Sequence, residues 1–162
     1  MHVVLVEREI PPNTGNVARL CAATHTQLHL IEPLGFELDD TQLKRAGMDY
    51  WQHVQWQRWR IWTEFKEKIA PRTRVWFIES GGPSLYTEVE FGSEDCLVFG
   101  RETAGLPKKW LEEDRDHRLR IPMFNPEARS LNLSNCVAVV LYEALRQQGF
   151  PGEFEPGRPA HV

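Results

Sequence analysis

Five short apolar runs constrain the fold of this chain more than any other feature. They are rich in valine, leucine, isoleucine and phenylalanine, and they lie at residues 3–6, 28–32, 74–79, 96–100 and 118–122. Segments with helical spacing separate several of them. Because strands that alternate with helices pair in parallel and are covered on both faces, the sequence predicts an α/β fold with an open, mainly parallel sheet between helices.

The clearest helical pattern runs from residue 15 to about residue 25, with Asn13 or Thr14 as its cap. One face of this helix collects Val17, Leu20, Cys21 and Thr24. Further helices are expected through residues 44–47 after a cap at Asp39 or Asp40, over 61–69, from about 107, and over 134–148. Ser134 is the expected cap of the last helix, and Gly149 is its expected stop.

The last helix is apolar nearly all round between Cys136 and Leu141. Such a helix must be covered on more than one side. Either the sheet and a neighbouring helix cover it, or a second copy of the chain does, and the sequence leaves both open.

Length and composition predict one domain with a real core. The chain has 162 residues, of which 41% are hydrophobic and 26% charged. We expect a single domain over residues 1–149 and a flexible tail over 150–162, which is rich in proline and glycine.

Cys21, Cys96 and Cys136 form no C-x-x-C pair, and no segment resembles a signal peptide or membrane span. These features predict a soluble, cytoplasmic protein with reduced cysteines.

The charge distribution is uneven. The net charge is −4, yet residues 44–74 hold eight Lys/Arg and three acids, a surplus of five. This surplus either forms a solvated, salt-bridged surface or attracts phosphate. Dinucleotide-binding and P-loop signatures are missing, and His and Cys show no metal-ligand spacing, so we expect no metal.

Three loops carry polar groups beyond what a turn needs. The first, residues 9–19, holds Asn13 and Arg19; the second, 99–107, holds Glu102 between two glycines. The third, 128–135 (ARSLNLSN), places five polar side chains before the last helix. Because each loop follows a predicted strand, the three should meet at a crevice along the strand ends, where α/β proteins bind ligands.

These same segments resemble a known class of enzymes. EIPPNTGN, LHLIEPLGF, FGRETAGLP and IPM followed by RSLNLSNCVAVVLYEA are similar to the motifs of SPOUT methyltransferases, most closely of the TrmL (YibK) type. That resemblance implies S-adenosylmethionine-dependent methylation of the ribose 2′-hydroxyl of the wobble nucleotide, a cytidine or modified uridine at position 34 of tRNA. It also implies a C-terminal deep trefoil knot, no metal, and a homodimer with the first and last helices at its interface.

The resemblance assigns roles to particular residues. The implied catalytic set is Arg19, Asn13, Ser130, Asn132, Glu102 and Tyr142. The implied donor-binding set is Ile78, Glu79, Ser80, Gly100, Arg101, Glu102, Gly105, Ile121, Pro122, Ser130, Leu131 and Leu133. RNA binding is expected of Arg19, Lys44, Arg45, Arg58, Arg60 and Arg129. Trp51, Trp56 and Trp59 lie among these cations, and we expect at least two of them in the core.

Two positions depart from the TrmL pattern, and three alternatives stay open. Arg8 and Arg101 stand where that type usually has proline. The first alternative is therefore a SPOUT 2′-O-methyltransferase that acts on another tRNA or rRNA position. A non-catalytic RNA-binding module of the same fold is a second alternative. A flavodoxin-like domain is the third, although no acidic or aromatic flavin loop is present.

Overall fold

The protein is built on a seven-stranded sheet in which every described pair of strands is parallel. The computed structural model describes residues 1–7, 11–33, 51–101 and 103–153. The strand order is β3-β2-β1-β6-β4-β7-β5. The strands are β1 (His2–Val6), β2 (Gln27–Ile31), β3 (Trp56–Trp59), β4 (Val75–Ile78), β5 (Ser84–Leu85), β6 (Cys96–Phe99) and β7 (Arg118–Arg120).

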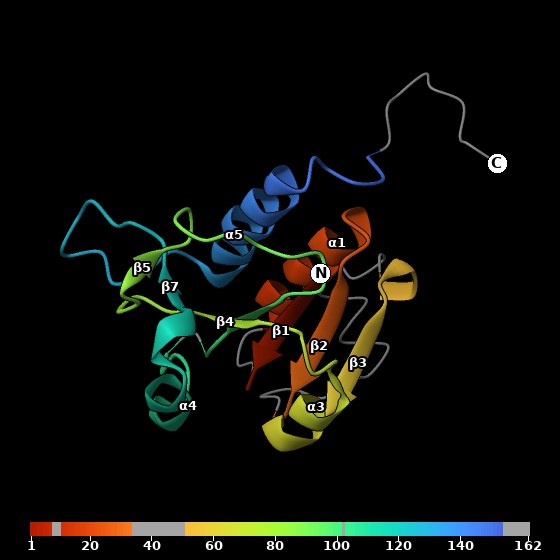
Figure 1. Cartoon of the computed structure of the whole chain (residues 1–162), viewed down its shortest axis with the longest axis horizontal. Coiled ribbons are helices and arrows are strands. Elements are labelled where there is room, and N and C mark those ends of the chain that lie inside the picture. The colour runs from red at the N-terminus through yellow and green to blue at the C-terminus, as the bar shows by residue number, and fades with distance from the viewer. Residues whose placement is uncertain (8–10, 34–50, 102, 154–162) are drawn as a thin grey trace.

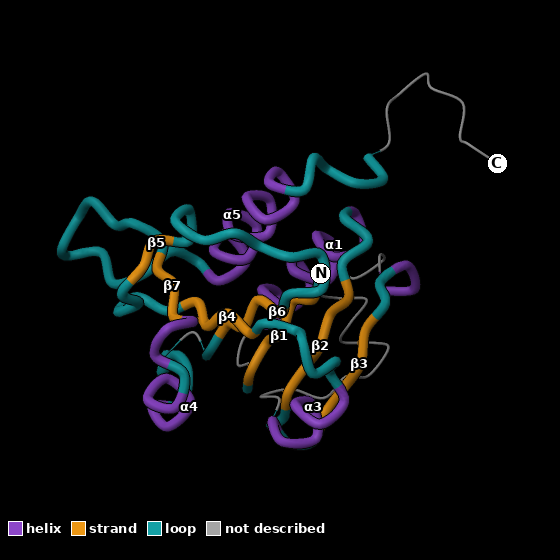
Figure 2. Tube along the Cα trace, viewed as in Figure 1, coloured by secondary structure: helices purple, strands orange, loops and turns teal. Residues whose placement is uncertain are grey.

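Helices cover both faces of this sheet (Figures 1 and 2). α1 (Pro11–Ala23) and α5 (Leu133–Gln147) pack side by side on one face. α3 (Trp62–Lys68) and α4 (Lys108–Glu113) lie on the other face, and two short 3₁₀ turns occupy Trp51–His53 and Arg115–His117. The predicted α/β architecture is therefore confirmed.

Alternation along the strands divides the core into two clusters. On β1, Val3 and Leu5 face α1 and α5, whereas Val4 and Val6 face the cluster that contains Phe65 of α3. All four side chains are at most 1% exposed. Successive strand residues point to opposite faces, so a strand covered on both sides must be apolar throughout. This is why the central strands read as unbroken apolar runs.

All five predicted strands are present, but β3 and β5 were missed. Among the described strands, β3 lies at the edge of the sheet and pairs with β2 alone, and its middle residues, Gln57 and Arg58, are exposed. It therefore lacks the apolar run that marks a central strand. β5 is two residues long and too short to leave a pattern.

The predicted helix boundaries need two corrections. α1 begins at Pro11, so Asn13 and Thr14 lie inside its first turn and do not cap it. Proline suits that first turn because it has no N–H to satisfy. Asn132, and not Ser134, caps α5. The expected helix through residues 44–47 and the tail from 154 lie outside the described residues.

α5 ends at the glycine that the sequence predicts. Gly149 adopts φ +73°, and the Phe150 N–H donates to the Leu145 carbonyl at 3.0 Å while the Gly149 N–H donates to Arg146 at 3.1 Å. This is the Schellman arrangement of a glycine-terminated helix.

No helix in the described part of the chain is long and apolar enough to cross a membrane.

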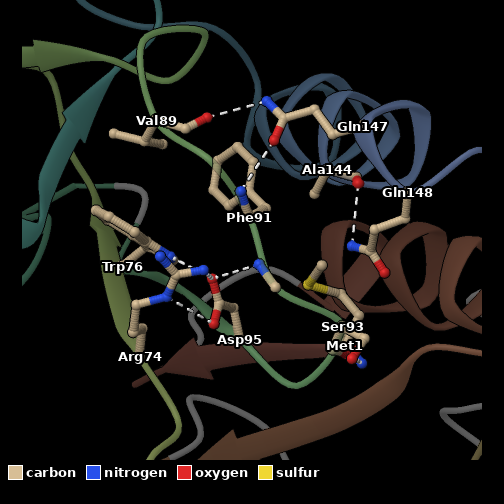
Figure 3. A network of polar contacts seen from close by, with 11 residues as sticks. Met1, Arg74, Trp76, Val89, Phe91, Ser93, Asp95, Ala144, Gln147 and Gln148 are labelled. Atoms are coloured by element: carbon tan, nitrogen blue, oxygen red, sulfur yellow. Dashed lines mark hydrogen bonds and ion pairs between the residues drawn. The ribbon is translucent and has the colours of Figure 1, made fainter.

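Polar contacts tie the segment before β6 to α5 and β4 (Figure 3). The Gln147 side chain accepts from the Phe91 N–H at 2.9 Å and donates to the Val89 carbonyl at 3.0 Å. Asp95, which is buried, accepts from the Trp76 indole at 2.8 Å and pairs with Arg74 at 3.0 Å. Pairing satisfies a carboxylate that would be costly to bury alone.

A buried histidine links β2 to both neighbouring strands. The Trp59 indole donates to His29 Nδ1 at 3.0 Å, and His29 Nε2 lies 3.1 Å from His2 Nδ1. An indole can only donate, so His29 carries its proton on Nε2 and donates to His2. Burial, and secondly the neighbouring His2, lowers the pKa of His29 from 6.5 to about 3. Burial also lowers the pKa of His2, whose Nε2 lies 3.6 Å from Glu94.

We expect His29 to make the protein less stable in mild acid. Above pH 6.5 the histidine is neutral in both states; as the pH falls toward 3, only the unfolded chain takes up the proton, and stability is lost. At pH 5 the loss amounts to about 2 kcal/mol. His29→Asn keeps an oxygen that can accept from Trp59 but does not titrate. Urea denaturation at pH 7 and pH 5 should show a smaller difference in the variant; an unchanged difference would contradict the assignment.

Candidate active site

One cavity of about 860 Å³ lies at the carboxyl ends of β4, β6 and β7. It brings together the following residues that the sequence singled out: Asn13, Ile78, Glu79, Ser80, Gly100, Arg101, Gly105, Ile121, Arg129, Ser130, Leu131, Asn132 and Leu133. The three polar loops thus converge at the edge of the sheet where parallel α/β proteins bind ligands. Its volume suits a small organic ligand.

A hydrogen bond between two asparagines joins the first and third loops. Asn132 Nδ2 donates to Asn13 Oδ1 at 3.0 Å across 119 positions of the sequence. Asn132 Oδ1 accepts from the Ser134 backbone N–H at 2.9 Å and from the Ser134 hydroxyl at 2.7 Å. One side chain therefore caps α5 and fixes the first turn of α1 beside it. Asn13 is only 6% exposed, so its amide is held at a nearly dry wall.

The second loop closes on itself through its two glycines. Arg101 and Gly105 exchange backbone hydrogen bonds of 3.0 Å in both directions, and Gly105 has φ +67°. A Cβ on Gly100 would lie 2.2 Å from the Gly105 carbonyl carbon. Both positions therefore require glycine, the first for space and the second for conformation. Arg101 also forms an ion pair with Glu7, which ties this loop to the end of β1.

Glu79 holds the loop after β4. Its Oε1 accepts from Arg118 Nε at 3.0 Å and Nη2 at 2.7 Å, and its Oε2 accepts from the Gly81 N–H at 2.8 Å. A Cβ on Gly82 would lie 2.5 Å from the Leu119 carbonyl carbon, so this loop packs directly on β7. The carboxylate at the cavity wall is thus fixed in place by a charge-assisted pair.

The polar stretch before α5 has two separate uses. Arg129, Ser130 and Asn132 line the cavity, whereas Ser134 bonds to Asn132. Asn135 is exposed and does not line the cavity. Cap and cavity together account for four of the five polar residues.

Several predicted site residues lie elsewhere. Arg19 is exposed on α1, Tyr142 is 49% exposed on α5, and neither lines the cavity. Pro122 is exposed between two residues that do, Ile121 and Met123. Glu102, Lys44 and Arg45, together with Arg8, lie outside the described residues.

The predicted basic surface is only partly described. Arg58 pairs with Glu32, and Arg60 is exposed. Trp56 packs against the larger core cluster, and Trp59 packs against the smaller one. The expectation that at least two of the three tryptophans belong to the core is therefore confirmed. Within the described residues no three His, Cys, Asp or Glu side chains form a group that could hold a metal ion.

Some cavity residues escaped the sequence analysis. They are Phe99, Thr103, Ala104, Leu106, Lys108, Leu111, Met123 and Cys136. Most are direct neighbours of predicted residues. Lys108 and Leu111 are three positions apart on α4. This spacing puts both on one face of a helix, and it could have predicted that they enter the cavity together.

Comparison with known proteins points to one family. Residues 1–142 match the SpoU rRNA Methylase family. A tRNA (cytidine(34)-2′-O)-methyltransferase of Saccharophagus degradans is 53% identical over 93% of this chain and 97% of its own length. A protein of the same name from Aeromonas hydrophila is 48% identical over 96% and 99%. A solved structure described as giving insight into 2′-OH methylation of C/U34 on tRNA superposes with a TM-score of 0.86, at 45% identity over 91% of this chain and 95% of that one.

We expect the bond between Asn13 and Asn132 to stabilise the protein independently of the helix cap. Asn132→Ala should lower the free energy of unfolding by about 1–2 kcal/mol, since it removes both interactions. Asn132→Ser keeps a good cap but cannot reach Asn13, so it should recover only part of the loss. In a double-mutant cycle with Asn13→Ala, denaturant unfolding should give a coupling of about 0.5–1.5 kcal/mol. A coupling of zero would show that the contact contributes nothing.

Proposed function

The chain belongs to the SpoU methylase family, and from this premise we propose that it is a tRNA methyltransferase that methylates the ribose 2′-hydroxyl of nucleotide 34. Two findings, taken together, carry the proposal. Similarity to relatives with this activity extends over nearly the whole of both chains, and the three polar loops meet at one cavity.

The cavity suits S-adenosylmethionine as the methyl donor. Ile78, Leu106 and Leu133 offer apolar surface for a purine, and the polar loops add hydrogen-bonding groups around it. When bound, this donor supplies an activated methyl group on a sulfonium. The residues proposed to hold it follow β4, β6 and β7, chiefly in the ranges 78–80, 100–105 and 121–133. The knot implied by the resemblance stays a prediction.

The proposed reaction is an in-line displacement at the methyl carbon. The ribose oxygen forms the new bond to carbon, the carbon–sulfur bond breaks, and the hydroxyl proton is released. Holding the two reactants in line can contribute roughly 7–11 kcal/mol toward such a step. Asn13, Ser130 and Asn132 lie where they can orient the ribose, and Asn132 is itself fixed by Ser134.

Arg19 is proposed to act on the hydroxyl or on the adjacent phosphate. A guanidinium keeps its proton in proteins, so it more readily stabilises a developing alkoxide than accepts its proton. Arg19 does not line the cavity of its own chain. α1 packs against α5, and α5 leaves Val139 and Tyr142 exposed. We therefore place Arg19 at the cavity of a second copy, in a homodimer that buries these two helices.

The activity is tested by incubating the protein with S-adenosylmethionine labelled on its methyl group and with bulk tRNA. Digestion to nucleosides should yield label in a 2′-O-methylated cytidine or uridine, and mapping should place it at nucleotide 34. Ribosomal RNA serves as the comparison substrate. Label at another nucleotide, or on a base, would reassign the substrate; no incorporation would leave a binding protein.

We expect Arg19→Ala to abolish methyl transfer while the affinity for S-adenosylmethionine, measured by calorimetry, stays nearly unchanged. Normal turnover in this variant would refute the assignment.

Mixed dimers test whether Arg19 acts on the second copy. Gly100→Ala should damage the cavity, because its Cβ would overlap Gly105. Mixing inactive Arg19→Ala with inactive Gly100→Ala chains should restore up to roughly a quarter of wild-type activity, since half the dimers would contain one complete site. No recovery would place Arg19 at its own cavity.

A further inference from the structure

Phe124 directly follows a residue of the cavity wall, and its side chain is exposed to solvent. Its side chain is 95% exposed, the highest value among the large hydrophobic residues that the structure describes. Its neighbour Met123 lines the cavity, and so does Arg129 at the other end of the same loop. The loop between β7 and α5 extends away from the body of the protein (Figure 1). An aromatic ring in water gains nothing for folding.

The loop around Phe124 is ordered by its own hydrogen bonds. Asn125 Oδ1 accepts from the Glu127 N–H at 3.0 Å, and the Asn125 carbonyl accepts from the Ala128 N–H at 3.1 Å. A side chain that accepts from the backbone two residues later stabilises a tight turn. Phe124 therefore precedes a defined turn, which reduces the entropy that binding would cost.

The surroundings of Phe124 favour RNA over protein as the binding partner. Asn125, Glu127 and Arg129 follow it in the loop, and all are exposed. The other exposed large apolar residues of this loop, Met123 and Leu131, belong to the cavity wall. A protein interface needs a broader apolar core. An exposed flat ring suits stacking on a nucleobase, and a cation elsewhere in the same loop suits a phosphate.

We propose that Phe124 stacks on a base adjacent to the target nucleotide and so positions the target ribose over the cavity. This inference rests on the proposed function. Phe124 is a positioning residue, since it acts through the substrate's orientation and not on the reacting atoms. Arg129, at the other end of this protein loop and on the cavity wall, is proposed to bind a phosphate of the RNA.

The test compares three variants with the wild type. Phe124→Ala and Phe124→Leu should each lower kcat/KM for tRNA by roughly 5- to 150-fold, chiefly through KM, because each removes the π face. Phe124→Leu retains apolar area, so it separates stacking from simple burial. Phe124→Trp should retain wild-type kcat/KM. The affinity for S-adenosylmethionine and the Tm should not change in any of them.

A fluorescent base gives a direct readout. With 2-aminopurine beside nucleotide 34, binding to the wild type should quench fluorescence through stacking, and Phe124→Ala should abolish the quenching. Equal kcat/KM in wild type and Phe124→Ala would overturn the inference while leaving the proposed function intact. Weaker self-association of Phe124→Ala in sedimentation, with unchanged kcat/KM per dimer, would instead assign Phe124 to a contact between two copies. A wild type that methylates no tRNA would remove the premise itself.

Discussion

The arrangement of the site depends on one side-chain contact, the hydrogen bond from Asn132 to Asn13. It fixes the start of α5 against the first turn of α1, and these are the two helices that cover one face of the sheet. Because the side-chain nitrogen of Asn132 makes this bond while its side-chain oxygen caps α5, one residue serves both the helix start and the cavity wall. The buried amide of Asn13 thus finds its partner in Asn132, as burial requires of a polar group.

The sheet supplies the second constraint. Parallel strands end at the same edge, so the loops after β4, β6 and β7 meet although they are distant in sequence. A different local contact then fixes the conformation of each loop. Glu79 pairs with Arg118, Gly100 packs on Gly105, and Asn132 caps α5. The cavity is therefore formed before any ligand enters, which lowers the cost of binding.

The sequence predicted the buried parts of the fold and most of the cavity. Apolar runs such as residues 96–99 identify central strands because both faces are covered. β3 was missed because an edge strand needs no such pattern. Loop residues such as Ser130 were found from unexplained polarity and family resemblance. Lys108 was missed because it enters the cavity from a helix. Arg19 was expected at the site but does not line the cavity of its own chain, since a helical pattern does not say which loops its exposed face meets.

The strand order has a consequence for the nascent chain. β1, β2 and β3 are complete by residue 59, and β1 can pair with β2 at once. The other edge of β1 pairs with β6, which begins only at Cys96. Until then a highly apolar strand leaves the ribosome with one row of backbone donors and acceptors unpaired, a state prone to sticking to other chains. That edge of β1 is therefore covered only after the segment up to and including β6 has been made.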